Sequence, residues 1–319
     1  SRGLGDVYKR QIIRDLDRTR IWVGTDGGGI FLYSAHTWQP IDSVSFGVLP
    51  RPVYSLWGKD DSLWIGGKGG LTLKTRENWV SFSREGIFDL SCDEIRDLSG
   101  DGGVLWALTD CGLLRSERSF RLYRVSNITH IESIEASSPY LWVGGDRGIG
   151  WMPLTGGSIA WVKNSSNLQV EDIVAAPRNI YILSIAGVLI YNKASRQWKS
   201  LEDPKGWSQF LAEKGTARGD TVIFATERGI IELIDGVEGY EYISPPFSPD
   251  KVFVNDVSLS DYGLFVATNS GLYVRERKTG TWRRYGVHDG LADDKINALW
   301  AKGDTVYVGT ERGVTILVP

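Results

Sequence analysis

Charged and polar side chains recur at one position of this sequence, directly after a short apolar segment that returns along the chain. The first such segment is Ile21-Trp22-Val23-Gly24-Thr25. The side chains at this position are Asp26, Lys68, Asp110, Asp146 with Arg147, Glu227 with Arg228, Asn269, and Glu311 with Arg312. If they converged on one opening, they would hydrogen-bond a polyhydroxyl or charged ligand. The same residue types also favour tight turns for structural reasons, so both interpretations stay open.

The apolar segment is part of a regular repeat. Its second residue is Trp22, Trp64, Trp106, Trp142, Tyr181, Ile223, Phe265 or Tyr307. The steps between these positions are 42, 42, 36, 39, 42, 42 and 42 residues. Self-similarity with such a period indicates a repeat architecture, in which each unit is one supersecondary structure.

Each repeat reads as four short strands. In the last repeat, residues 295–300, 306–310 and 314–318 alternate apolar and polar side chains, and glycine and aspartate stand at the breaks, as in β-hairpins. A glycine after the second strand recurs as Gly70, Gly112, Gly148, Gly187, Gly229, Gly271 and Gly313. We expect these glycines to occupy a turn position with positive φ.

The fourth strand carries an aromatic residue in nearly every repeat. These residues are Trp38, Trp79, Phe120, Trp161, Trp198, Tyr240 and Trp282. Aromatic side chains bury a large area where sheets meet, so we interpret them as packing between neighbouring sheets rather than as platforms for a sugar.

Units of about 40 residues with four antiparallel strands predict an all-β protein, a β-propeller. The units are residues 12–42, 49–83, 90–125, 127–164, 168–202, 206–244, 250–287 and 291–319. We expect a single ring of eight blades whose last blade lacks its outer strand, with the closing strand encoded before residue 12. The alternative is a seven-bladed ring plus one blade of a second propeller, which would be the last unit.

Residues 1–11 stand apart from the repeats. Their sequence, SRGLGDVYKRQ, resembles the translation of a transposase adapter used to prepare sequencing libraries. We therefore exclude them from fold reasoning and expect the natural N-terminus to be missing.

Composition excludes several classes of function. The chain has a formal net charge of -3 and no basic block, so binding to nucleic acid is not expected. No apolar run approaches the roughly 18 residues of a membrane-spanning helix. The histidines His36, His130 and His288 lie in different units, without the short spacing of metal ligands. We therefore predict no metal, no cofactor and no catalytic residues.

The two cysteines allow one specific prediction. If residues 94–98 pair with residues 105–109 so that Ile95 faces Leu108, then Cys92 falls opposite Cys111 at one end of a blade. That geometry permits a cross-strand disulfide, which an oxidising compartment would favour.

Two segments suggest a family. Residues 289–299 (DGLADDKINAL) with 306–314 (VYVGTERGV), and residues 21–30 (IWVGTDGGGI), closely resemble the two-component regulator propeller repeat. The resemblance extends over residues 12–319, although units four to six depart from it, as at Ile182-Leu183-Ser184. It implies an extracytoplasmic (periplasmic or extracellular) sensory domain, typically followed by a transmembrane helix and a histidine kinase.

Three functions remain open at this stage. The first is a binding or sensing propeller that recognises a glycan or a partner protein at the face formed by the charged turns and the inter-blade loops, where Phe46, Phe88, Trp207 and Phe247 lie. Loops on a rigid scaffold are where function usually resides. The second is a glycoside hydrolase or polysaccharide lyase that uses carboxylates at that face, and the third is a structural component of a cell-surface or secretion assembly.

Overall fold

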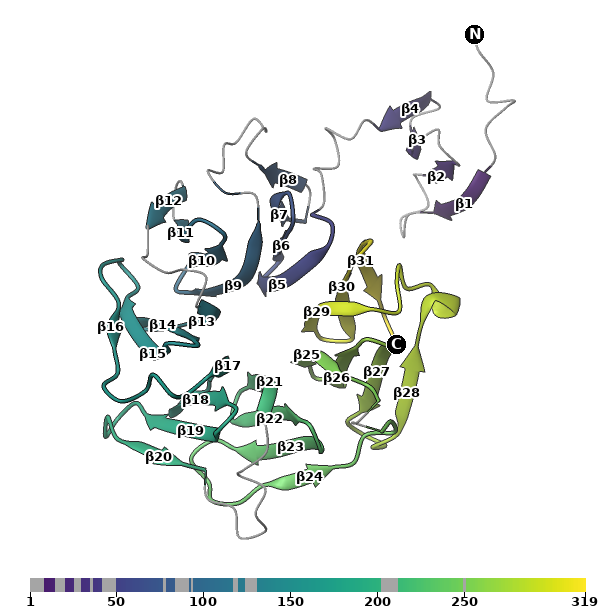
Figure 1. Cartoon of the computed structure of the whole chain (residues 1–319). Coiled ribbons are helices and arrows are strands. Elements are labelled where there is room, and N and C mark those ends of the chain that lie inside the picture. Colours follow the sequence, from purple (N-terminus) through teal and green to yellow (C-terminus); the bar gives the residue numbers. More distant parts are fainter. Residues whose placement is uncertain are drawn as a thin grey trace.

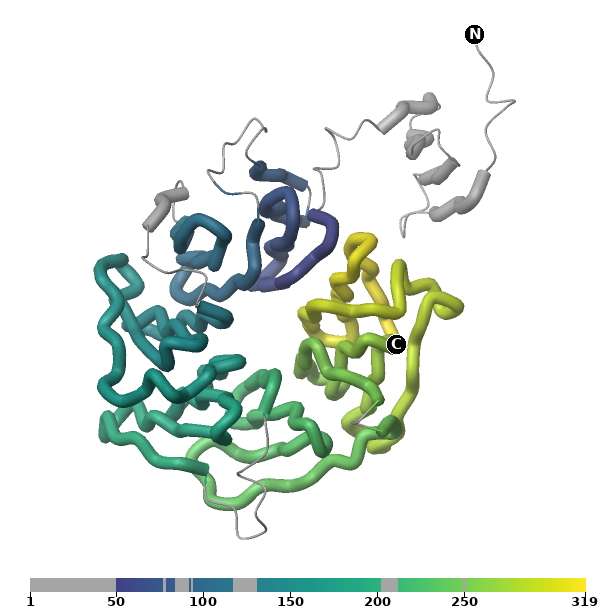
Figure 2. Tube along the Cα trace, viewed as in Figure 1, coloured from purple at the N-terminus to yellow at the C-terminus, as the bar shows by residue number. Residues whose placement is uncertain are grey.

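The computed structural model (Figures 1 and 2) describes residues 9–14, 21–25, 30–34, 37–41, 50–76, 79–83, 92, 94–116, 120–123, 131–201, 212–248 and 251–319. For residues 9–41 and 120–123 it describes only the strands and their pairing. Four residues of the predicted binding face lie outside the described residues: Asp26, Phe46, Phe88 and Trp207.

The described chain is almost entirely β-structure. Its strands are β1 (Lys9–Arg14), β2 (Ile21–Thr25), β3 (Ile30–Ser34), β4 (Thr37–Ile41), β5 (Val53–Lys59), β6 (Ser62–Gly67), β7 (Gly70–Lys74), β8 (Trp79–Phe82), β9 (Ile95–Asp101), β10 (Val104–Thr109), β11 (Leu113–Ser116), β12 (Phe120–Tyr123), β13 (Ile131–Ser137), β14 (Tyr140–Gly145), β15 (Gly148–Pro153), β16 (Ala160–Trp161), β17 (Val170–Ala175), β18 (Asn179–Ser184), β19 (Gly187–Asn192), β20 (Trp198–Ser200), β21 (Ala212–Arg218), β22 (Thr221–Thr226), β23 (Gly229–Ile234), β24 (Glu241–Ile243), β25 (Val254–Leu259), β26 (Gly263–Thr268), β27 (Gly271–Glu276), β28 (Trp282–Tyr285), β29 (Ile296–Lys302), β30 (Thr305–Thr310) and β31 (Gly313–Leu317). A short 3₁₀ helix, η4 (Val287–Asp289), precedes β29. Within the described residues, no helix has the length and apolarity needed to cross a membrane.

The strands form antiparallel sheets in simple sequential order, and each sheet is a blade that we name by its first strand. The β5, β9, β13, β17, β21 and β25 blades have four strands each, and the β29 blade has three. The first strands of these seven blades pack side by side around a common centre, and β29 packs against β5 to close the ring (Figure 1). The fold is therefore a seven-bladed β-propeller.

Ring closure rests on contacts like those between the other blades. Ala298 of the β29 blade belongs to one apolar cluster with Val53 and Leu56 of the β5 blade. The Asn297 side-chain amide also donates a hydrogen bond to the Val53 carbonyl at 3.0 Å. The first and last blades of the ring are thus in direct contact, and no further blade fits between them.

This closure decides between the two arrangements that the sequence left open. The ring has seven blades rather than eight, because the β29 blade occupies the place beside β5. The first unit, β1 to β4, forms a separate sheet, and the last unit belongs to the ring. Lys9 and Gln11 pair with Thr25 and Gly24 of β2, so this segment does not supply the outer strand of the β29 blade. Among the described residues, β31 pairs only with β30.

The recurring glycine after each second strand has the predicted conformation. Gly70, Gly112, Gly148, Gly187, Gly229, Gly271 and Gly313 all have φ between 90° and 154°. A hydroxyl at the end of the second strand donates to the glycine carbonyl three residues later, as in Thr226 to Gly229 at 2.9 Å and Thr310 to Gly313 at 2.9 Å. The spacing of threonine and glycine in the repeat therefore encodes this turn.

An earlier glycine of the repeat allows neighbouring blades to approach. A Cβ atom added at Gly309 would lie 2.6 Å from Val53 Cγ1, and one at Gly66 would lie 2.6 Å from Ile95 Cγ2. In both cases the contact is with the first strand of the next blade. The fourth-strand aromatic Trp79 packs against an apolar cluster that joins the β5 and β29 blades, as Trp300 and Tyr307 also do.

Candidate functional site

The predicted charged turns lie on one face of the ring, which we call the loop face, together with the connections between blades. The turn and the start of the first strand are joined by backbone hydrogen bonds, such as Asp110 N–H to Glu94 O at 3.2 Å and Asn269 N–H to Phe253 O at 3.2 Å. Lys68, Asp110, Asp146, Arg147, Glu227, Arg228, Asn269 and Arg312 are exposed there, and Glu311 is half-buried.

Several of these side chains serve the local structure. Asp110 and Asn269 each accept a hydrogen bond from the backbone N–H that lies 16 residues earlier, at 3.3 and 3.1 Å respectively. The Arg147 guanidinium lies 5.5 Å from the ring centroid of Trp161. Arg312 pairs with Asp293 at 3.2 Å. These polar groups therefore stabilise the turns themselves. This agrees with the interpretation that polar residues occur here because they favour tight turns.

Glu311 differs because it reaches toward the centre of the ring. Its carboxylate pairs with Lys295 at 2.9 Å and accepts a hydrogen bond from Asn297 Nδ2 at 3.3 Å. The hydrogen bond from Lys295 is the main reason why the pKa of Glu311 is below its usual value. Among the predicted turn residues, Glu311 thus contacts a side chain that lines the central cavity described below.

The loop-face aromatic Phe247 is not presented to a ligand. Its ring lies 4.7 Å from that of Tyr273, between centroids, and it packs against an apolar cluster of the β21 and β25 blades.

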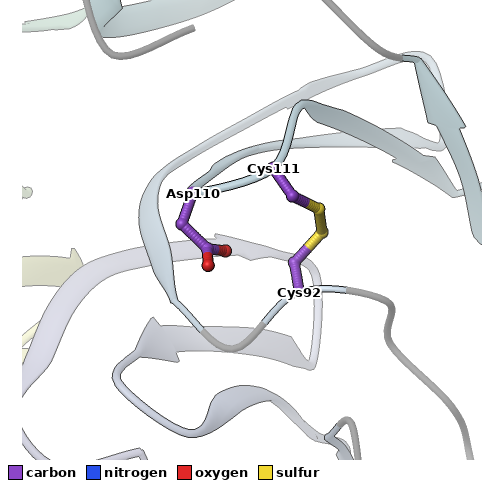
Figure 3. Close-up of side chains that lie close together, drawn as sticks. All are labelled: Cys92, Asp110 and Cys111. Carbon is purple, nitrogen blue, oxygen red and sulfur yellow. A yellow bond between two sulfur atoms is a disulfide. The ribbon is translucent and has the colours of Figure 1, made fainter.

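Cys92 and Cys111 are joined in a disulfide at the loop-face end of the β9 blade (Figure 3). Their Cα atoms are 5.8 Å apart. The expected strand register was wrong, since Ile95 pairs with Thr109 and not with Leu108. An extra residue, Arg96, bulges from β9 at this point. Because the two sulfurs beside Asp110 are bonded to each other, this group is not a set of metal ligands.

Removing this disulfide should destabilise the β9 blade. The bond closes a loop with a sequence separation of 19, for which the loss of unfolded-state entropy corresponds to about 3 kcal/mol. We expect the Cys92→Ala, Cys111→Ala double variant to melt several degrees below the wild-type protein in a calorimetric scan. A reducing agent should lower the melting temperature of the wild type alone. Equal melting temperatures for both proteins under oxidising conditions would contradict this.

A polar cavity of about 260 Å³ opens at the centre of the ring. It is lined by the first strands of the blades, which share one irregularity. Each strand has a β-bulge near its start, so that one residue is skipped in the pairing with the second strand. The skipped residues are Tyr54, Arg96, Glu132, Glu171, Glu213, Asn255 and Asn297, and all are polar. Bulges re-aim side chains, and five of these seven residues line the cavity.

In five of the seven blades, the next residue of the first strand forms a second layer of the cavity. Ser55, Asp97, Asp172, Lys214 and Asp256 occupy this position and line the wall. Several of the acceptors bind a backbone N–H of the following blade: Asp97 accepts from Ile134 at 2.8 Å, Asp172 from Gly215 at 3.0 Å and Asp256 from Leu299 at 2.6 Å. We call these interactions inter-blade latches.

A further carboxylate, Glu135, lies deeper in the cavity and forms a latch of the same kind. It accepts hydrogen bonds from Ser99 Oγ at 2.8 Å and from Ala175 N–H at 3.3 Å. Burial raises the pKa of Glu135 to about 8. Burial likewise raises the pKa of Asp256 to about 7 and that of Asp97 to about 6. Near neutral pH the cavity therefore contains carboxyl groups that can hold a proton.

Lys214 is the cation of the second layer. Burial by itself lowers the pKa of its ammonium group, but the carboxylates of Asp172, Asp97 and Asp256 outweigh that effect and the pKa is raised. The ammonium is therefore charged and faces the acidic wall. A cavity with carboxylates, amides and the half-buried Lys214 ammonium can exchange many hydrogen bonds with a polar ligand.

Sequence reasoning missed these cavity residues, although the signal was present. The second-layer positions Ser55, Asp97, Ser133, Asp172, Lys214, Asp256 and Ala298 follow one another at steps of 42, 36, 39, 42, 42 and 42 residues. These are the steps of the apolar segments. A polar residue that recurs at the same position within successive first strands would have identified the lining of the channel.

The fold and this site define a class: a seven-bladed β-propeller with a polar central cavity. Several solved structures share the fold. The extracellular domain of the putative hybrid two component system BT3049 from B. thetaiotaomicron has a TM-score of 0.65 and 18% identity, and the match covers 98% of this chain and 45% of that one. The extracellular domain of the putative one component system BT4673 from the same organism has a TM-score of 0.63 and 16% identity, with 99% and 59% covered.

A third structure comes from a different setting. PorZ, described as an essential bacterial surface component of the type-IX secretion system of Porphyromonas gingivalis, has a TM-score of 0.63 and 14% identity, with 84% of this chain and 37% of PorZ covered. This chain spans about half the length of the sensor domains that it matches. No protein-family model and no curated protein matches the chain.

Proposed function

We propose that this chain is a non-catalytic, ligand-binding propeller from the extracytoplasmic part of a sensor, and that it recognises a glycan or a partner protein at its loop face. The observation that carries the proposal is the central cavity. Residues near the loop-face start of the first strands line it, and its wall bears carboxylates, amides and cations from six blades. Small-molecule sites are concave and orient their ligand with a few convergent polar groups.

Two observations support an extracytoplasmic location. The Cys92–Cys111 disulfide is of a kind that persists in oxidising compartments. The solved structures BT3049 and BT4673 are extracellular domains of putative hybrid two component or one component systems. In a full-length sensor we expect a membrane anchor and a kinase module to receive the signal.

The cavity acids favour binding over catalysis. Asp97, Asp172 and Asp256 each give one carboxylate oxygen to a backbone N–H of the next blade. These acids hold the frame of the ring in a fixed position, whereas a glycosidase needs two carboxyl groups that act on the scissile bond.

The proposal is tested with a rim residue that forms no latch. Glu132 is exposed at the cavity mouth, so Glu132→Ala should leave the fold intact. Loss of a charged hydrogen-bond partner weakens binding by about 1.5–3 kcal/mol. We expect a ligand found on a glycan panel to bind Glu132→Ala about tenfold or more weakly in calorimetric titration. The matched control is Glu238→Ala, an exposed glutamate outside the cavity, which should bind like the wild type.

The same panel tests the enzymatic alternative. Release of shorter products from any glycan would overturn the non-catalytic proposal. If Glu132→Ala bound the ligand as tightly as the wild type, the ligand would bind outside the cavity.

A further inference from the structure

A second cavity, of about 460 Å³, lies where the ring closes, on the face opposite the loop face. We call it the closure pocket. Its lining residues come from the hairpin turns and strand ends of the β5 and β29 blades, among them Asp61, Lys74, Arg76, Trp300, Lys302 and Tyr307. It shares no lining residue with the central cavity. Its volume is within the range of about 300–1,000 Å³ that holds small ligands.

Two aromatic rings form one wall of the closure pocket. The ring centroids of Trp300 and Tyr307 are 5.4 Å apart, and both side chains are half-buried. Trp300 packs directly on the backbone of Gly58, because a Cβ atom there would lie 2.4 Å from the indole. The wall is therefore fixed by the inter-blade contact and offers apolar ring surface to a ligand.

The polar side of the pocket has an excess of positive charge. Asp61 pairs with Lys302 at 3.4 Å and with Arg76 at 3.6 Å, and Lys302 also donates to the Asp60 carbonyl. The Lys74 ammonium lies instead 5.8 Å from the Tyr307 centroid and 5.7 Å from the Trp79 centroid. Among the described residues, no carboxylate lies within ion-pair distance of Lys74. Three cations thus face two acidic side chains, and Lys74 stands beside the aromatic wall.

We propose that the closure pocket binds a saccharide unit that carries an acidic group. The apolar face of the sugar ring lies against Tyr307 and Trp300, and its carboxylate or sulfate contacts Lys74. Ser62 and Thr305 supply hydroxyl groups for the sugar hydroxyls. The anionic group is assigned because charge-assisted hydrogen bonds to a cation beside apolar surface are stronger than neutral ones. This site is independent of the loop-face function proposed above.

The closure pocket lies between the β5 and β29 blades, so a ligand bound there should also stabilise the ring against thermal unfolding. Residues of the β5 and β29 blades, which lie 241 positions apart at Asp61 and Lys302, would contact the same molecule. A ligand that binds only the closed ring raises the melting temperature by mass action. Binding and thermal stabilisation should therefore appear together.

The test uses glucuronate, glucose 6-sulfate and neutral glucose as probes, with calorimetric titration and thermal melting of the whole chain. We expect glucuronate, glucose 6-sulfate or both to bind and to raise the melting temperature, whereas glucose binds at least about tenfold more weakly. Lys74→Met keeps the apolar stem and removes the charge, and it should lower the affinity for the acidic probe by a similar factor. Lys278→Met, at an exposed lysine in a different hairpin, is the matched control and should bind like the wild type.

A second variant separates the wall from the charge. Tyr307→Leu keeps the site apolar but removes the ring, and we expect weaker binding of the acidic and neutral probes alike. The proposal is overturned if neither acidic probe binds, if glucose binds as well as they do, or if Lys74→Met binds them as the wild type does. The ratio of glucuronate to glucose 6-sulfate affinity identifies which acidic group the pocket accepts.

Discussion

Gly309→Ala is expected to destabilise the propeller ring at its closing junction. The added methyl carbon would stand 2.6 Å from Val53 Cγ1 and 3.2 Å from Val53 Cβ, closer than atoms can pack. Overpacking of this kind costs about 1–3 kcal/mol. The chain has an ordinary backbone conformation at Gly309, since its φ is not positive, so the clash alone carries the effect. Differential scanning calorimetry should show a melting temperature several degrees below that of the wild type.

Two companion variants make this result specific. Val53→Ala removes the clashing methyl groups, so the double variant should recover part of the stability that Gly309→Ala loses. Gly66→Ala produces the same clash with Ile95 at an internal junction and should cost about as much, because both sites are packed alike. If Gly309→Ala melted like the wild type while Gly66→Ala did not, the ring would not be closed between β29 and β5.

Lower stability at alkaline pH is the second large effect that we expect. The pKa of Glu135 is about 8 in the folded protein and 4.5 as a free side chain. Between these values the folded protein retains a proton that the unfolded chain has released, so the free energy of unfolding falls as the pH rises from 4.5 through 8. Asp256 and Asp97, with pKa values of about 7 and 6, act in the same direction from 3.8 upward.

Glu135→Gln isolates the largest of these contributions. Glutamine cannot ionise, so the free energy of unfolding of the variant should increase relative to that of the wild type between pH 5 and pH 9. The expected increase is about 2 kcal/mol, because solvent screening reduces the full effect of the pKa shift. Urea unfolding at several pH values measures the difference. Glu311→Gln is the opposite control. The pKa of the Glu311 carboxyl is lowered through Lys295, so the stabilising effect of Glu311 in the wild type is lost only as the pH falls into the acid range. Parallel pH profiles for Glu135→Gln and the wild type would exclude this role of Glu135.

The repeat pattern predicted the blades, but not how many of them form the ring. Each unit carries the same local signals, such as the turn threonine and glycine of Thr310 and Gly313. These signals specify one blade, whereas the size of the ring depends on the angle between blades and on which two surfaces meet. Val53 and Gly309 meet because of that angle, and no local pattern marks the first unit as a separate sheet.

The site was harder to predict because it depends on one extra residue in each first strand. The sequence placed Glu311 after a second strand, and in the described residues it and its equivalents lie there. A bulge changes which residue faces which partner, and this is why Ile95 was expected opposite Leu108 and pairs with Thr109 instead. The same bulge brings polar residues such as Asp97 and Asp256 to the channel wall. Strand alternation alone cannot locate such a shift.

The junction between the β29 and β5 blades has a consequence for the kinetics of unfolding. In the described residues, no strand is shared between the β29 and β5 blades, so the ring is closed by side-chain packing and by single hydrogen bonds such as Asn297 to Val53. Separating these two blades therefore breaks no ladder of strand hydrogen bonds, whereas pulling a strand out of any sheet does. Loss of the native state should begin at this junction, and interactions placed there would lengthen the lifetime of the folded protein.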